Sequence, residues 1–143
     1  MDHVVYVDAK AKEMDKLIDG EKTMIIRGAA GRKLPYGRVN SNDVLYFINN
    51  NAEGMVKARG TVKRVFNSDK MSKDESVAVV EQNQDKLQLT AAQVKRWAGK
   101  RYLVLVDVED AVSLEPFAID KSNYGNMDDW LPVGEIDTVK IRA

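Results

Sequence analysis

The hydrophobic positions of the chain repeat with a period of two in some segments and with a period near 3.6 in others. Alternation or short apolar runs predict about six strands, at residues 3–7, 22–27, 44–48, 55–66, 102–108 and 136–142. Helical spacing predicts one helix that Asp8 caps and Gly20 ends, and two more that begin in capping boxes at Ser72 and Thr90. This order is typical of an α+β domain built on a mostly antiparallel, closed sheet.

Two segments follow neither period. Residues 28–38 contain three glycines and one proline, which predicts an irregular, exposed loop. Residues 113–134 are predicted to form a long connection before the last strand. Within the strand at residues 55–66, Gly60 predicts a bulge or bend of the kind that small barrels use to close.

Composition narrows the class of protein. The chain has 143 residues, 44% of them hydrophobic and 31% charged, which indicates one globular domain spanning residues 1–143. It has no cysteine, and its one histidine is His3, so we expect no disulfide, no metal site and no cysteine nucleophile. We also expect no cofactor. No apolar run approaches the roughly 20 residues that span a bilayer, and a cysteine-free chain suits the cytoplasm.

Charge is segregated along this chain of zero net charge. Residues 22–42 hold five cations and no carboxylate, whereas residues 107–137 hold nine acids and one base, Lys121. We therefore expect a partner to bind along a local basic groove rather than across the whole surface. The acidic final third leaves open a module that binds another protein, but no motif supports it.

The stretch Gly20-Glu21-Lys22-Thr23 follows a predicted helix and opens a strand that ends at Arg27. This pattern resembles the signature of ASCH domains in the PUA-like superfamily, which are small β-barrels associated with RNA and modified nucleosides. The resemblance covers most of the chain up to about Val108. It implies a PUA-like barrel that binds RNA or a modified nucleotide in a basic cleft, with Lys22, Thr23 and Arg27 in the site. Convergence of Lys22 and Arg27 requires Lys22 to lie in the turn before the strand, because strand alternation would otherwise separate them.

Further binding residues are expected on the loop and near the C-terminal end. Arg32, Lys33 and Arg38 would contact phosphate, and Tyr36 offers a ring on which a base can stack. The segment around Trp130 resembles EVE domains, a more distant PUA-like group in which an aromatic residue helps to enclose a base. Tyr124 and Trp130 are accordingly expected to line a base pocket. Each of these residues has an alternative role, as a solvated loop residue or as part of the core.

Catalysis is the alternative function. Some ASCH-domain proteins are amidohydrolases that remove the acetyl group from acetylcytidine with a lysine, a threonine and a glutamate. Lys22 matches the lysine, and Glu81 or Glu75 would supply the glutamate. The family's threonine falls at Ile25, which has no hydroxyl, so Thr23 would serve only in a different strand register.

Three other features are expected to be structural. Trp97 lies at helical spacing from Val94 and is expected to pack in the core, and His3 is expected to be structural or inert. The basic stripe of the long strand, at Lys57, Arg59, Lys63 and Arg64, is expected to be a solvated sheet face.

Overall fold

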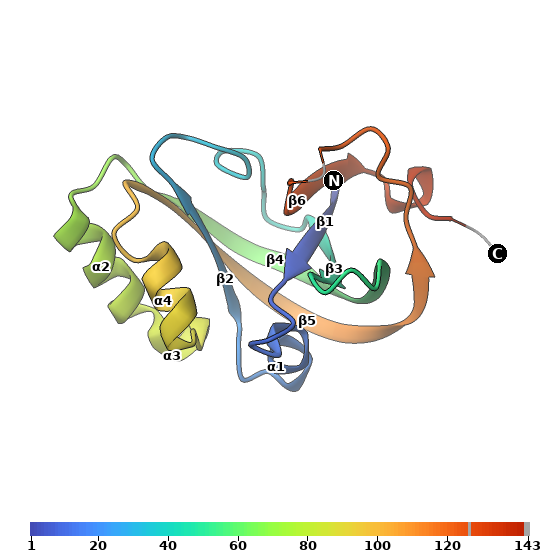
Figure 1. Ribbon diagram of the computed structural model, residues 1–143, viewed down its shortest axis with the longest axis horizontal. Coiled ribbons are helices and arrows are strands. Elements are labelled where there is room, and N and C mark those ends of the chain that lie inside the picture. The colour runs from blue at the N-terminus through green and yellow to red at the C-terminus, as the bar shows by residue number, and fades with distance from the viewer. Residues whose placement is uncertain (126, 142–143) are drawn as a thin grey trace.

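The computed structural model describes residues 1–125 and 127–141 as an α+β fold (Figure 1). Within these residues, six strands and four α-helices follow in chain order: β1 (Asp2–Val7), α1 (Glu13–Asp19), β2 (Met24–Ala29), β3 (Val44–Asn49), β4 (Met55–Asn67), α2 (Lys73–Gln82), α3 (Gln84–Leu87), α4 (Ala91–Trp97), β5 (Tyr102–Ala118) and β6 (Trp130–Gly134). The predicted fold class, with a helix after the first strand and helices before the penultimate strand, is confirmed. None of the described helices is long and apolar enough to cross a membrane.

The sheet is mostly antiparallel and curls into a half-barrel. Its strand order is β2-β5-β4-β3-β1-β6, and the β1–β3 pair is parallel. Figure 1 shows the long strands β4 and β5 curving around the shorter ones. In the part of the chain that the structure describes, no strand ladder joins the two edge strands β2 and β6. The prediction of a closed sheet is therefore wrong, and side chains bridge the open side instead.

The capping motifs in the sequence correctly predicted where two of the helices begin. Ser72 and Thr90 each accept a hydrogen bond from the backbone three residues on, so both predicted capping boxes are present at the starts of α2 and α4. The first helix begins later than predicted, at Glu13. The Asp8 carboxylate instead accepts from the Ala11 backbone N–H at 3.1 Å and closes a turn before the helix.

The second half of the sheet departs from the predictions. β5 continues past Val108 to Ala118, so the predicted connection at residues 113–134 is wrong. Its hydrophobic run stops at Val108 because the strand leaves the core there, yet pairing with β4 goes on through register shifts. One shift lies at Gly60, where an added Cβ would stand 2.6 Å from Val108 Cγ1, so the predicted bulge at this glycine is confirmed.

The C-terminal strand is also different. β6 occupies Trp130–Gly134, and its proline is tolerated because β6 is an edge strand. The strand predicted at residues 136–142 is wrong: Ile136–Thr138 is a 3-10 helix, and Lys140 makes only an isolated bridge to Ile119. Gly134, with φ of 83°, reverses the chain between the two. Arg142, the predicted end of that strand, lies outside the described residues.

Two apolar layers flank the sheet. The inner layer fills the curl, and Phe47, Ile25 and Trp130 are fully buried in it. The outer layer lies between the sheet and helices α2 to α4, where Met24 and Ile26 of β2 meet the helices. Alternation along β2 therefore sends Ile25 inward and its neighbours outward. This packing fixes α4 against β2 and holds the end of α4 beside Arg27.

Candidate functional site

Two hollows meet on the open side of the half-barrel. We call the first, of about 500 Å³, the polar hollow; its walls include Asp8, Glu13, Asn49, Asn50, Gln93 and Lys121. We call the second, of about 340 Å³, the basic hollow; its walls include Lys33, Leu34, Tyr36, Lys100 and Tyr102. Both share Arg27, Arg96, Trp97, Met127 and Asp129. The two hollows therefore form one groove whose middle is Arg27 and the end of α4.

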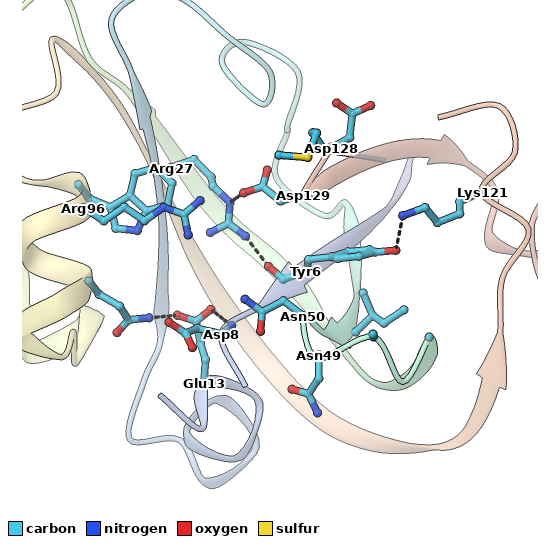
Figure 2. Close-up of a pocket in the computed structure, with 16 residues that line it drawn as sticks. Tyr6, Asp8, Glu13, Arg27, Asn49, Asn50, Arg96, Lys121, Asp128 and Asp129 are labelled. Carbon is cyan, nitrogen blue, oxygen red and sulfur yellow. Dashed lines mark hydrogen bonds and ion pairs between the residues drawn. The ribbon is translucent and has the colours of Figure 1, made fainter. Parts of the chain in front are cut away.

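Arg27 bridges the open side of the sheet. It lies on edge strand β2, and its Nη2 donates to the Tyr6 carbonyl on β1 at 2.6 Å (Figure 2). Its Nη1 donates to the Ile26 carbonyl at 2.8 Å. Its guanidinium carbon lies 5.8 Å from the Trp97 ring centroid and 5.6 Å from that of Trp130. The guanidinium is thereby held in one orientation between the two hollows.

The remaining nitrogen of this guanidinium, Nε, lies next to the Asp129 carboxylate. Arg27 is 8% exposed, and its Nε lies 3.1 Å from Asp129 Oδ2. The geometry is that of an ion pair without a hydrogen bond, and among the described residues Nε has no hydrogen-bond acceptor. The Asp129 carboxylate balances the Arg27 charge at the junction of the two hollows.

Lys22 lies in the turn before β2, as convergence with Arg27 required, but it does not enter the groove. It is 2% exposed, its Nζ donates to the Leu87 carbonyl, and Nζ lies 3.5 Å from Glu13 Oε2. Burial lowers the pKa of the Lys22 ammonium, the Glu13 charge opposes this, and Arg27 adds to the lowering. Lys22 and Thr23 instead line a separate hollow.

The polar hollow has a floor that the sequence did not indicate. Glu13 Oε2 accepts from Gln93 Nε2 at 3.1 Å, and Glu13 Oε1 accepts from the Asp8 backbone N–H at 3.3 Å (Figure 2). Gln93 Oε1 accepts from the Thr90 backbone N–H at 3.0 Å, as the capping box requires. The capping box therefore fixes which way the Gln93 amide faces. That box was visible in the sequence, but its partner Glu13 was not.

The predicted basic loop lies beside the basic hollow. Lys33 is exposed on its wall, and the Tyr36 hydroxyl donates to the Ser68 carbonyl at 2.6 Å. The Arg32 guanidinium carbon lies 5.6 Å from the ring centroid of Tyr36 and 5.7 Å from that of Tyr102. Arg38 is exposed and lines neither hollow. Of the four loop residues predicted to bind, Lys33 and Tyr36 line the groove, whereas Arg32 and Arg38 do not.

The aromatic residues that line the groove differ from those that the sequence predicted. Trp130 is 1% exposed, and Tyr124 packs against a core cluster around Leu131, so neither lines the groove. Trp97, expected only to pack, lines both hollows while also packing behind them. The Arg96 guanidinium carbon lies 4.4 Å from the Trp97 ring centroid. The adjacent arginine and tryptophan at the end of a predicted helix were the available signal.

Trp130 instead anchors His3. Trp130 Nε1 donates to His3 Nδ1 at 3.0 Å, so the proton of the neutral imidazole is on Nε2, which lies 2.9 Å from Asp43 Oδ2. Burial lowers the pKa of His3 and outweighs the opposing effect of the Asp43 carboxylate. This chain of hydrogen bonds holds β6 on β1 and agrees with a structural histidine.

The groups of the catalytic alternative lie apart. Glu81 is exposed on α2, and Glu75 accepts from the Ser72 backbone N–H in the capping box. Ile25, at the position of the family's threonine, is 1% exposed. The carboxylate next to Lys22 is that of Glu13. Within residues 1–125 and 127–141, no group of three or more acidic or histidine side chains is placed to hold a metal.

Solved structures show the same fold. An ASCH protein from Zymomonas mobilis superposes with a TM-score of 0.70 at 12% identity, over 96% of this chain and 90% of that one. Crystal structures of two single-residue variants of that protein give TM-scores of 0.70 and 0.69 over the same share of this chain, 96%, again at 12% identity. The fold is ASCH-like. No protein-family model and no curated protein matches the sequence, and the low identity establishes the fold alone.

Proposed function

We propose that this ASCH-like domain binds single-stranded RNA or a modified nucleotide in the groove formed by the polar and basic hollows. The observation that carries the proposal is the pair of exposed cations Lys33 and Lys100 on the wall of the basic hollow, beside the Arg27 guanidinium that the Tyr6 and Ile26 carbonyls fix. Phosphate oxygens are the anionic partners that exposed lysines bind in nucleic-acid complexes.

The two hollows suit different parts of a nucleotide. Lys33, Arg96 and Lys100 surround the basic hollow and would meet phosphate oxygens. The parts of Tyr36 and Trp97 that line the basic hollow would contact a base or ribose. The polar hollow supplies amides and carboxylates, among them Asn50 and Asp8, which read hydrogen-bonding edges of a base.

The remaining predicted residues take secondary places in this proposal. Arg32 and Arg38 add positive charge beside the basic hollow without lining it. Lys22, Thr23, Tyr124 and Trp130 line neither hollow. We do not extend the proposal to amide hydrolysis, because Lys22 is paired with Glu13 away from the groove and Glu81 is exposed elsewhere.

Fluorescence anisotropy of a labelled single-stranded RNA of about 12 nucleotides tests the proposal. The double variant Lys33→Ala, Lys100→Ala removes two exposed groove cations, and we expect RNA affinity to fall about tenfold at moderate salt. The control, Lys63→Ala with Lys95→Ala, removes two exposed lysines that line neither hollow. A parent protein that does not bind RNA at low salt, or a groove variant that binds as tightly as the parent, would refute the proposal.

A further inference from the structure

Another hollow lies at the end of the molecule next to the basic hollow. We call it the end hollow; it measures about 530 Å³ and is lined by Lys70, Met71, Ser72, Lys73, Gly99 and Arg101. Three of these six residues are cations, and none is a carboxylate. All three cations are exposed. A concave surface with one sign of charge concentrates counter-ions of the opposite sign, so this hollow favours an anionic partner.

The end hollow and the basic hollow are separated only by the turn between α4 and β5. Lys100 lines the basic hollow, while its neighbours Gly99 and Arg101 line the end hollow. Backbone hydrogen bonds join the segments that line the two hollows. Met71 N donates to the Arg101 carbonyl at 2.9 Å, and Ala29 is paired with Tyr102 in the sheet. Figure 1 shows the end of β2, the start of β5 and the segment before α2 together at one end of the sheet.

The turn between the two hollows is held in place. Gly99 has φ of 97°, and its backbone N–H donates to Ser76 Oγ of α2 at 3.1 Å. A Cβ added at Gly99 would stand 3.4 Å from Lys73 Cγ, so the stem of Lys73 lies across this glycine. The cations of the end hollow are therefore carried on a fixed platform rather than on a free loop.

The cations, and not the start of α2, make this surface. The Ser72 hydroxyl accepts from the Glu75 N–H, and the Glu75 carboxylate accepts from the Ser72 N–H, so the capping box occupies these donors. Asp69 and Asp74 are exposed nearby but do not line the end hollow. In the basic hollow the Asp129 carboxylate is ion-paired with Arg27. Positive charge is thus continuous from Lys33 through Lys100 to Arg101 along the two hollows.

We propose that the ligand is a polynucleotide chain, and that it runs from the basic hollow across the turn at residues 99–101 into the end hollow. This inference rests on the proposed RNA binding and specifies its substrate class. A free nucleotide fills one hollow, whereas a chain with a phosphate at each nucleotide reaches the cations of both. Affinity should therefore rise with RNA length until the chain reaches the end hollow.

The test is an affinity series with labelled single-stranded RNAs of about 3, 6, 9 and 12 nucleotides. In the triple variant Lys70→Ala, Lys73→Ala, Arg101→Ala, we expect about tenfold weaker binding of the longest RNA and unchanged binding of the shortest. For the longest RNA, the slope of log affinity against log salt should become shallower by about 0.7 for each phosphate that the variant no longer neutralises. The control is again Lys63→Ala with Lys95→Ala, and thermal melting of each variant checks the fold.

The outcomes separate this inference from the proposed function. Binding that does not depend on length, or a triple variant that binds long RNA like the parent, overturns the polynucleotide path and leaves groove binding intact. An equal loss of affinity for short and long RNA also overturns the path, since the end hollow would then act on the groove itself. A parent protein that binds no RNA of any length overturns the proposed function, and this inference with it.

Discussion

The polar hollow and the basic hollow share Arg27, Arg96 and Trp97, but their charged groups have different partners. In the polar hollow, Glu13 accepts hydrogen bonds from Gln93 and from a backbone N–H. In the basic hollow, Lys33 and Lys100 are exposed cations, and none of the salt bridges found in the described residues involves them. Charged groups that already have partners hold the fold together, whereas exposed cations leave their charge available to a ligand.

Lys22 and Lys33 show the difference within one run of sequence. Both belong to the cation-rich stretch at residues 22–42, yet Lys22 is 2% exposed beside Glu13 and Lys33 is exposed on the groove wall. Charge pattern alone cannot separate them, because the pairing of Lys22 depends on a tertiary contact. The comparison predicts that substitutions in the buried Glu13–Lys22 pair act on stability, and that substitutions of the exposed cations at the basic end act on affinity.

The largest expected effect is that of Glu13→Ala. It leaves the Lys22 ammonium buried without its carboxylate, and breaking a buried ion pair in this way costs about 3–5 kcal/mol of unfolding free energy. Urea unfolding at neutral pH measures this loss. The double variant Lys22→Met, Glu13→Gln removes both charges and should be more stable than Glu13→Ala. A Glu13→Ala protein within about 0.5 kcal/mol of the parent would show that the pair contributes nothing to the fold.

Trp130→Phe should have the next largest effect. The change keeps an aromatic ring in the inner layer but removes the Nε1–H that His3 Nδ1 accepts, so a buried acceptor loses its partner. This costs about 1–3 kcal/mol of unfolding free energy. Because Trp130 does not line the groove, RNA affinity of the folded variant should equal that of the parent. If a fully folded Trp130→Phe protein binds RNA more weakly than the parent, Trp130 takes part in RNA binding after all.

The parts of the structure that the sequence predicted are those with local causes. The capping boxes at Ser72 and Thr90 and the apolar run at residues 102–108 depend on neighbouring residues, and all three are present. The strand β6 was missed because Pro132 interrupts its run, and only its edge position makes that tolerable. Glu13 was missed because its partner Gln93 lies 80 residues away in the chain.

The candidate site was predictable only in outline. The sequence indicated a basic groove and placed Arg27, Lys33 and Tyr36 near it. Charge segregation and loop composition can be read from the sequence without knowledge of the fold. The sequence did not indicate that Trp97 rather than Trp130 would form the wall. Both tryptophans are at least 90% buried, and Trp97 reaches the groove because α4 packs against β2 beside it.

A change of pH tests the role of His3 by another route. Because burial lowers the pKa of His3 below its usual 6.5, the unfolded chain binds the proton more readily than the folded one. The stability due to neutral His3 is therefore complete above pH 6.5 and is lost as the pH falls from there toward the lowered pKa. Urea unfolding between about pH 7 and pH 5 measures it. In Trp130→Phe this loss should be shallower, because Nδ1 no longer accepts a hydrogen bond; an unchanged slope would contradict the assignment to His3.

The smallest expected effect on stability is that of Lys33→Ala at the basic end. Lys33 is exposed, so its removal should change the unfolding free energy by less than about 0.5 kcal/mol. RNA affinity should nevertheless fall a few-fold, and the slope of log affinity against log salt should drop by about 0.7, the value for one phosphate contact on a single strand. Lys95→Ala, on the same helix as Arg96 but outside both hollows, should change neither quantity. If Lys33→Ala and Lys95→Ala weaken RNA binding equally, cations in the groove contribute no more to RNA affinity than cations outside it. The two ends of the groove would then differ only in their effect on stability.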